Sequence, residues 1–368
     1  MMKEKSRGFF GKLIVFILAL LATIGVVAMA LSVLDAYINP NRFIWTTFFG
    51  LAFWEILFYN VLILILLLAM KSKKAWIAVI ALMIAIPGFS KSYSRGKKAT
   101  DENSIRIMSY NVHNFKHVDG KTSQEEFGNQ VVKMVREENP DILCCQEFTT
   151  FKKRMSRHQC IQEFADETGF QYTYYNQKNS FAGNVIFSKY PIERVSGVSD
   201  FTKEHVYGIM VSVDAGEKGK FHVANIHLLS YMITDSEIES LTTPQERQEY
   251  EALGKTLVHK LKFAFECRSK ELQQVLKGLA SVEGPIVVCG DFNEPPLSYN
   301  YRQMQKAGFV DAFTMVGHGI KPTYAGKLPL LRIDYAWAND GVTPLSFKRH
   351  HWKASDHYPI ILDFAIQQ

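Results

Sequence analysis

One run of 22 residues without a charged side chain, Leu13 to Leu34, most constrains how this chain can fold. A helix that is apolar on every side and this long matches the hydrocarbon thickness of a bilayer. A second apolar run, Phe43 to Met70, contains one charge, and a third, Ala75 to Phe89, is shorter. Residues 1–92 are therefore predicted to be a membrane anchor with two or three transmembrane helices, at about 13–34, 43–70 and 75–89.

Two of these runs have a second interpretation. Basic residues precede the first run, and Ala28-Met29-Ala30 resembles the cleavage site of a signal peptide. We favour an uncleaved anchor, because the apolar stretch continues past that site. The third run has only 15 residues, so it is either a short span or a helix lying in the membrane interface.

The charges are distributed unevenly along the chain. Residues 1–103 carry 12 Lys/Arg and 5 Asp/Glu, whereas the remainder carries 30 and 31. With three spans, seven positive charges flank the side that holds the N-terminus and five flank the other side. The positive-inside rule then predicts an extracytoplasmic C-terminal domain. The protein is expected to be a multi-pass protein of a bacterial inner membrane. If the third segment does not span, the predicted orientation reverses.

The character of the sequence changes after the apolar runs. The stretch "SKSYSRGKKATDEN" is polar and basic, and residues 93–103 are predicted to be a linker. From Ile105 onward, short apolar strands alternate with loops and with helices near 124–138, 159–168 and 244–279. Many strands with few helices between them favour two sheets packed face to face, with helices outside. Residues 104–368 are therefore predicted to be one α/β domain.

Polar side chains recur where these apolar strands end. One such side chain has an ordinary explanation as a cap or a turn residue, but eight of them, all acid, amide or imidazole, do not. Carboxylate and carbonyl oxygens suit Mg²⁺, which stabilises charge on a phosphoryl group, and a carboxylate–histidine pair suits proton transfer. The residues are Asn111, Glu147, His227, Asp291, Asn293, Asp334, Asp356 and His357.

Taken in order, these motifs resemble the endonuclease/exonuclease/phosphatase superfamily. The motifs that carry the resemblance are "SYNV", "CQEF", "NIHL", "GDFNEPP", "RIDY" and "SDH", and they cover about residues 104–368. The resemblance implies a four-layer α/β/β/α sandwich like that of deoxyribonuclease I, with the site at one edge of the paired sheets. It also implies a metal-dependent hydrolase of phosphate esters that uses water as the nucleophile.

The resemblance further implies a role for each matching residue. Glu147 would be the principal ligand of Mg²⁺, or of Mn²⁺, with Asn111 and Asp356 as direct or water-mediated ligands. Asp334 would orient His357, and His227 would contact phosphate or protonate the leaving oxygen. Asp291 and Asn293 would orient the nucleophile and the scissile phosphate, the general base being either Asp291 or the Asp334–His357 pair. Asn184, in "FAGNVIFSKYPI", would contact substrate phosphate.

One residue departs from the family pattern, and it bears on substrate choice. His113 stands where repair-type members place an acid two residues beyond the asparagine, which argues against a repair-nuclease metal arrangement. Basic residues after Glu147, namely Lys152, Lys153, Arg154 and Arg157, favour a nucleic acid, whereas the neutral charge balance of the domain does not.

Three functions therefore stay open at this point. We expect a membrane-tethered enzyme with endonuclease-like activity on phosphodiesters. Hydrolysis of a phospholipid or an inositol phosphate is the alternative, because the tether places the domain beside the bilayer. A membrane-anchored binding protein without activity is a third interpretation, although every matched position holds a residue competent for catalysis.

Overall fold

The structure is a computed structural model of the chain, and it describes residues 8–176, 182–195, 207–233, 237, 240, 243, 247–326 and 330–367. The predicted start of the helix at 244–246 and the basic residues Lys3, Lys5 and Arg7 lie outside these residues. Backbone contacts divide the chain into two compact units. Unit 1 is Met1–Lys91 with Pro295–Arg302, and unit 2 is Ser92–Glu294 with Gln303–Gln368.

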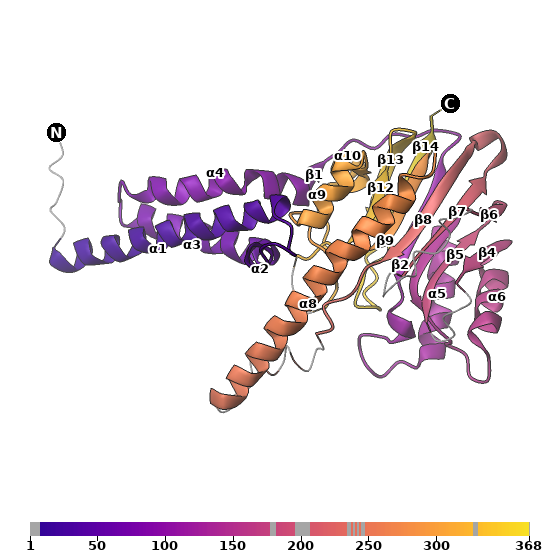
Figure 1. Cartoon of the computed structure of the whole chain (residues 1–368), viewed down its shortest axis with the longest axis horizontal. Helices are drawn as coiled ribbons and strands as arrows, with labels where there is room; N and C mark the ends of the chain where they lie inside the picture. Colours follow the sequence, from indigo (N-terminus) through magenta and orange to yellow (C-terminus); the bar gives the residue numbers. More distant parts are fainter. Residues whose placement is uncertain are drawn as a thin grey trace. The chain divides into compact units, whose positions relative to one another are not determined.

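Unit 1 is built from apolar helices (Figure 1). They are α1 (Phe9–Leu34), α2 (Trp45–Leu51), α3 (Phe53–Ala69) and α4 (Ala75–Ser92). In the described part of the chain, α1 with its following turn and α4 are each long and apolar enough to cross a membrane. The second predicted span is two helices, α2 and α3, which meet at an angle of 69°. The number of candidate spans is therefore two, or three if this bent pair is counted as one.

Unit 2 contains two six-stranded sheets. The first has the strand order β13-β14-β2-β3-β5-β4 and the second the order β10-β12-β9-β8-β7-β6. Each sheet combines one parallel pair with antiparallel pairs, β2 with β3 in the first and β8 with β9 in the second. Strand bounds in the first sheet are β2 Ile105–Asn111, β3 Ile142–Phe148, β4 Tyr172–Tyr175, β5 Gly183–Ser188, β13 Val342–Arg349 and β14 Ile360–Ile366. Those in the second are β6 Ile192–Arg194, β7 Tyr207–Asp214, β8 Lys220–His227, β9 Ile286–Asp291, β10 Val310–Asp311 and β12 Asp334–Ala338.

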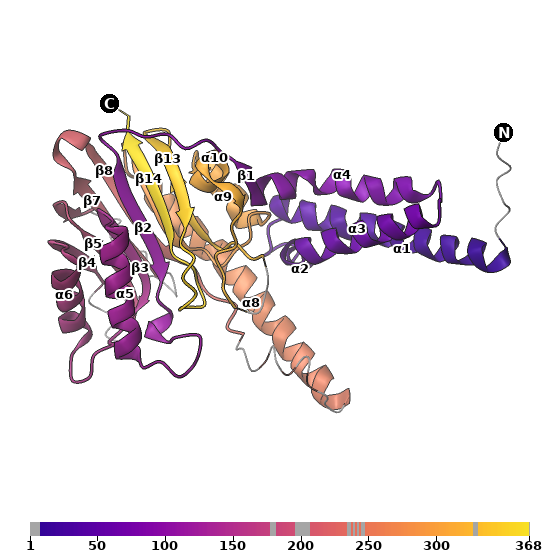
Figure 2. The ribbon, with the colours of Figure 1, turned by 180° about the vertical axis from the view of Figure 1, so that it is seen from behind.

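Helices cover the outer faces of the paired sheets (Figure 2). Helices α5 (Gln124–Glu138) and α6 (Arg157–Thr168) lie over the first sheet, and α8 (Arg247–Leu279) lies on the side of the second. Two further helices, α9 (Tyr299–Lys306) and α10 (Ala312–Val316), follow β9 and β10 in the chain. The predicted four-layer α/β/β/α arrangement is therefore confirmed.

Alternation along the strands explains these layers. In β2, Ile105 and Ile107 belong to a buried cluster that includes Ile209 and Val287 of the second sheet. Met108 and Tyr110, further along the same strand, belong to a different cluster, shared with α5 and α6. Because successive side chains of a strand point to opposite faces, one strand supplies both the core between the sheets and the core under the helices.

The predicted linker contains regular structure. Residues Tyr93–Arg95 form β1, which pairs with β11 (His318–Ile320), and the amide of Ala99 donates to the carbonyl of Leu345. The main chain before β2 is thus bonded to the rest of unit 2 at two places. The polar, basic composition of this stretch carried no signal for these main-chain hydrogen bonds.

Candidate active site

Three neighbouring strands of the second sheet bring His227, Asp291 and Asp334 into register. His227 is the partner of Asp291 across β8 and β9, and Asp334 is its partner across β12 and β9. Gly290, just before Asp291, has φ +141°, and a Cβ there would lie 1.8 Å from the carbonyl oxygen of Ile226. Glycine therefore permits β9 to approach β8 this closely at the point where it delivers Asp291.

A β-bulge at the end of β3 directs Glu147 to the same edge. Regular alternation would place Glu147 on the helix-covered face of the sheet with Cys145, but the pairing of β3 with β5 shifts register between Cys145 and Phe148. Glu147 also has a left-handed backbone, with φ +54°. Bulges change the direction of a side chain in this way, so the predicted metal ligand depends on a local irregularity of the strand.

The amide of Asn111 connects the two sheets at the site. Its Nδ2 lies 3.3 Å from Oε1 of Glu147, from the first sheet, and 3.1 Å from Oδ2 of Asp291, from the second. Nε2 of His227 lies 3.7 Å from each of the same two carboxylate oxygens. Two carboxylates, an amide and an imidazole thus converge on one small volume.

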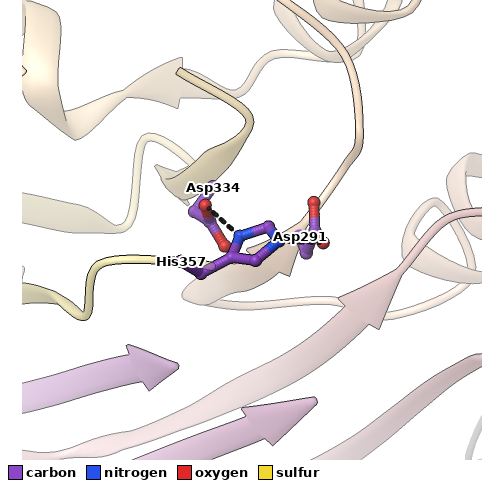
Figure 3. Close-up of side chains that lie close together, drawn as sticks. All are labelled: Asp291, Asp334 and His357. Carbon is purple, nitrogen blue, oxygen red and sulfur yellow. Dashed lines mark hydrogen bonds and ion pairs between the residues drawn. The ribbon is translucent and has the colours of Figure 1, made fainter. Parts of the chain in front are cut away.

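His357 lies between two buried carboxylates, as Figure 3 shows. Its Nδ1 is 2.9 Å from Oδ2 of Asp334, and its Nε2 is 3.5 Å from Oδ2 of Asp291. Burial by itself lowers the pKa of His357, but the nearby carboxylates of Asp334, Asp291 and Asp356 outweigh it and raise this pKa well above 6.5. Burial, together with the charge of Asp334, raises the pKa of Asp291 to about 6.

The ligand atoms of Asp291, Asp334 and His357 lie within 4.8 Å of one another, close enough for a metal ion to be considered there. Hydrogen bonding explains the same closeness, because Nδ1 of His357 faces Asp334 and its Nε2 faces Asp291. We therefore interpret this group as a hydrogen-bonded relay. The carboxylate of Glu147, outside this group, offers the better place for a cation.

The other predicted site residues are held in different ways. The amide hydrogen of Asn293 points to Oδ1 of Asp291, and its Nδ2 donates to the carbonyl of Leu228. Asp356 accepts a hydrogen bond from Ser355, and its Oδ1 is 3.5 Å from Nδ1 of His113. Asp356 therefore lies at the rim beside His113.

Asn184 is buried, and its contacts differ from those of the other predicted residues. Its Nδ2 donates to the main-chain carbonyl of Asn225, 2.9 Å away, within the packing between the two sheets. This bond joins β5 to β8 and is a structural contact. The predicted contact between Asn184 and substrate phosphate is thus without support from its amide nitrogen.

Asn114 is a site residue that the sequence reasoning did not identify. Its Nδ2 donates to Oε2 of Glu147 over 2.5 Å, so both carboxylate oxygens of Glu147 accept a hydrogen bond from an asparagine. Asn114 has φ +52°, a conformation that asparagine tolerates better than most residues. The sequence signal that could have identified Asn114 is a second side-chain amide three residues after Asn111, in "NVHN".

A network of buried amides lies directly behind the site. Nε2 of Gln146, next to Glu147, donates to Oδ1 of Asn225 and to the hydroxyl of Ser109. Nδ2 of Asn225 donates in turn to the carbonyls of Cys145 and Val185. Buried polar groups that are paired in this way resist displacement, so the strand ends that carry Asn111 and Glu147 are fixed to β8.

Helix α8 supports the loops that follow β8 and β9. The buried side chain of Arg268 donates to Glu294, with Nε 2.6 Å from Oε1, and to the carbonyl of Leu229. Glu271, one turn further along, accepts a hydrogen bond from the amide of Leu229. Because Leu229 and Glu294 lie within two residues of His227 and Asn293, the helix constrains both of these loops.

Of the four basic residues after Glu147 that we expected at the surface for a nucleic acid, Lys153 and Arg154 are exposed, but Lys152 and Arg157 are not. Lys152 is ion-paired with Glu163 and Glu167, at 2.7 and 2.8 Å, and its side chain is largely buried. Arg157 is also buried and donates to the carbonyl of Phe148. The prediction was therefore wrong for these two residues, because two glutamates of α6 pair with Lys152 and the last carbonyl of β3 accepts from Arg157.

Comparison with known proteins agrees with the geometry. Residues 108–357 match the model of the endonuclease/exonuclease/phosphatase family, and residues 12–92 match a domain of unknown function, DUF8431. No curated protein is similar enough in sequence to be counted as a relative.

Several solved structures share the fold. An endonuclease/exonuclease/phosphatase from Beutenbergia cavernae has 19% identity and a TM-score of 0.51, and the match covers 72% of each chain. The human Nocturnin catalytic domain, solved with a bound sulfate anion, also has 19% identity and a TM-score of 0.51, over 73% of this chain and 96% of that one.

A protein of the same family from Bacteroides vulgatus has 14% identity and a TM-score of 0.50, over 72% of this chain and 99% of that one. At these identities the structural likeness shows the fold, and the match of the sequence to the family model covers more than half of the chain. The chain therefore belongs to the endonuclease/exonuclease/phosphatase family.

Proposed function

We propose that this protein is a membrane-tethered, metal-dependent phosphodiesterase with endonuclease-like activity. One observation carries the proposal: the Asn111 amide joins the carboxylates of Glu147 and Asp291 across two sheets, with His227 3.7 Å from both. Two carboxylates brought together at one place repel each other, and a bound cation would offset that repulsion. Oxygen donors next to imidazoles suit hydrolysis of a phosphate ester.

The donor set fits a hard divalent cation, Mg²⁺ or Mn²⁺. Glu147 would be the principal ligand, with Asp356 near the rim. Asn111 would act through water, since its Nδ2 already bonds the carboxylates and its Oδ1 accepts the amide of His113. Mg²⁺ at this site would polarise a phosphoryl oxygen and offset negative charge in the transition state.

The remaining residues would orient the reactants and move protons. Asp334 holds the Nδ1 proton of His357, so that Nε2 is directed to Asp291. Asp291, the hub of these contacts, would accept a proton from the attacking water, and Asn293 would help to place the scissile phosphate. His227 would contact phosphate and protonate the leaving oxygen. The products would be a phosphate monoester and an alcohol.

The test is Mg²⁺-dependent cleavage by the full chain in detergent micelles. Plasmid DNA, RNA, sphingomyelin and phosphoinositides would be offered side by side. The Glu147→Gln variant should lose activity, and the matched Glu125→Gln variant, changed on the exposed side of α5, should keep it. Cleavage of DNA or RNA that survives Glu147→Gln would contradict the proposal.

Hydrolysis of a phospholipid or an inositol phosphate is the second candidate. The apolar helices α1 and α4 favour it, because they would hold the enzyme beside lipid headgroups. Cleavage confined to sphingomyelin or phosphoinositides in the same assay would select this candidate over the nuclease.

We also propose that unit 1 anchors the protein in a bacterial inner membrane, with the catalytic domain extracytoplasmic. The length and apolar composition of α1 and α4 support the anchor, and with the bent pair α2–α3 counted as a third span the distribution of positive charge supports the orientation. Protease added to intact spheroplasts should degrade the catalytic domain. Protection until the membrane is opened would reverse the proposed orientation.

A further inference from the structure

A cavity of about 1020 Å³ lies next to the proposed catalytic site. Asp356 and Tyr324 line it, and the ring of Tyr324 packs at 5.7 Å against the ring of His357. The cavity volume is at the upper end of the range for small-molecule sites. It has space for a part of the substrate that extends beyond the scissile phosphate.

Positive charge lines two walls of this cavity. Lys116 comes from the segment after β2, and Lys353 comes from the segment between β13 and β14. A hydrogen bond from the amide of Val118 to the carbonyl of Ala354 joins these two segments. His113 and His117 also line the cavity, and among its described lining residues Asp356 is the one acid.

Neither lysine is neutralised within the described part of the chain. Lys116 and Lys353 form no ion pair there, whereas Lys152 and Lys348 are each paired with a glutamate. Asp119, close to the cavity, has its carboxylate bonded to the amides of Lys121 and Thr122. Two unneutralised ammonium groups in one recess attract an anion strongly.

The wall that carries Lys116 is fixed in an unusual backbone conformation. His113, Asn114 and Phe115 all have left-handed φ values, of +48°, +52° and +55°. Such a run is costly and persists where its surroundings impose it. Here the buried ring of Phe115 packs at 4.9 Å against Phe148 and at 4.5 Å against Phe151. This turn presents Asn114 to Glu147 and the neighbouring His113 and Lys116 to the cavity.

We propose that Lys116 and Lys353 bind a second phosphate group of the substrate while the first is hydrolysed. The inference rests on the proposed function, because that function places a phosphate ester at the adjacent site. Lysine is a common phosphate ligand and acts as a point charge. The part of the substrate that joins the hydrolysed phosphate to the second phosphate would lie in the cavity. The enzyme would therefore prefer substrates with two phosphates over those with one.

Matched substrates with and without a second phosphate test this proposal. The full chain in detergent would receive thymidylyl-thymidine and its 5′- and 3′-phosphorylated forms, and also glycerophosphoinositol with and without a 4-phosphate. We expect one phosphorylated form to be hydrolysed with a kcat/KM about 10-fold to 100-fold higher than its parent. A preference within the dinucleotide pairs would identify a nucleic acid as the source of the second phosphate. A preference within the glycerophosphoinositol pair would identify a lipid headgroup as the source.

Variants that remove positive charge distinguish phosphate binding in the cavity from a general effect of the positive charge of the protein. The double variant Lys116→Met/Lys353→Met should lose this preference and leave the parent compounds nearly unaffected. The control Lys133→Met/Lys277→Met removes the same charge from exposed helical positions and should keep the preference. Equal kcat/KM values for both members of every pair, or a preference that survives in the cavity variant, would overturn the proposal.

A binding measurement distinguishes failure of the subsite from failure of the proposed function. In EDTA, where no hydrolysis occurs, the doubly phosphorylated probes should bind the full chain more tightly than their parents, and the cavity variant should abolish this difference. Tighter binding without hydrolysis of any substrate would support the subsite and contradict the proposed function. Hydrolysis without any difference in binding or rate between the members of a pair would support the proposed function and contradict the subsite.

Discussion

Arg268 and Glu294 form an ion pair in the interior of the catalytic domain, with Nε 2.6 Å from Oε1 and both side chains almost completely buried. The guanidinium also lies 4.3 Å from the ring centre of Tyr231. One helix thereby contacts the segments that follow His227 and Asn293. The pair gives the long charged helix α8 a role in positioning the site.

Replacing Arg268 with Met should destabilise the catalytic domain by about 3–5 kcal/mol, because it breaks a buried ion pair by removing one of its two members. Urea unfolding of the full chain in detergent, followed by near-UV circular dichroism, would measure the loss. Lys262→Met, on the same helix but in an exposed pair with Glu266, should change stability by less than about 1 kcal/mol. An equal loss of unfolding free energy in the two variants would show that the buried ion pair stabilises the domain no more than the exposed pair does.

Replacing His357 with Ala should lower the turnover number about 10²-fold to 10⁴-fold, because the group between Asp334 and Asp291 is lost. The measurement is kcat for the substrate found in the cleavage assay, with far-UV circular dichroism to verify the fold. His351→Ala, an exposed histidine in the same segment, is the matched control. Turnover close to that of the unmodified protein would exclude the proposed role of His357.

Replacing Asn114 with Ala should weaken metal binding about 10-fold to 100-fold, since groups that orient a metal ligand have effects of this size. The change frees Oε2 of Glu147 from its hydrogen bond. The Mg²⁺ concentration for half-maximal activity and the Kd for Mn²⁺ from calorimetry would both report it. Asn139→Ala alters another left-handed asparagine, at the end of α5, and controls for backbone strain. A similar metal affinity in the Asn114 and Asn139 variants would refute the prediction.

His222, on β8, should make the domain less stable in acid. Burial lowers its pKa below 6.5, so the unfolded chain binds a proton at higher pH than the folded one. Its contribution is present above about pH 6.5 and is lost as the pH falls below that value. Nδ1 of His222 lies 2.9 Å from the hydroxyl of Ser212. His222 also lines a cavity, and the other ionisable residues among its described lining are Glu193, Asp214, Lys220 and Glu283.

Thermal unfolding at pH 8 and pH 5.5 would test this dependence. The fall in Tm between the two should be smaller in a His222→Asn variant than in the unmodified chain. An equal fall in both would assign the acid sensitivity to other groups.

Much of the fold could be predicted because local patterns encode it. The alternation in Ile105–Asn111 predicts a half-buried strand, and Ser123 followed by an amphipathic stretch predicts α5, whose N-cap accepts the amide of Glu126. The boundaries of α5 at 124 and 138 agree with the prediction. The second apolar run also predicted helix correctly, although composition could not reveal the 69° bend between α2 and α3.

The candidate site could be predicted as a set of residues, but its contacts could not. An acid at the end of an apolar strand, such as Asp291, is conspicuous in any sequence because burial of a charge is costly. Asn114, Asn225 and Arg268 are ordinary polar residues in their local context. Their importance depends on partners far away in the chain, as in the bond between Gln146 and Asn225.

The sequence by itself therefore determined the two-part organisation, the layered α/β class and the identity of the polar strand-end residues. Each of these depends on local hydropathy and on the spacing of apolar and polar residues along the chain. Only the tertiary structure decided that Asn111 bonds both Glu147 and Asp291, that a bulge turns Glu147 toward the site, and that Arg157 is buried. These features arise from strand register and packing between distant segments. The free energy that fixes them comes from burial and long-range hydrogen bonds, which short sequence patterns do not specify.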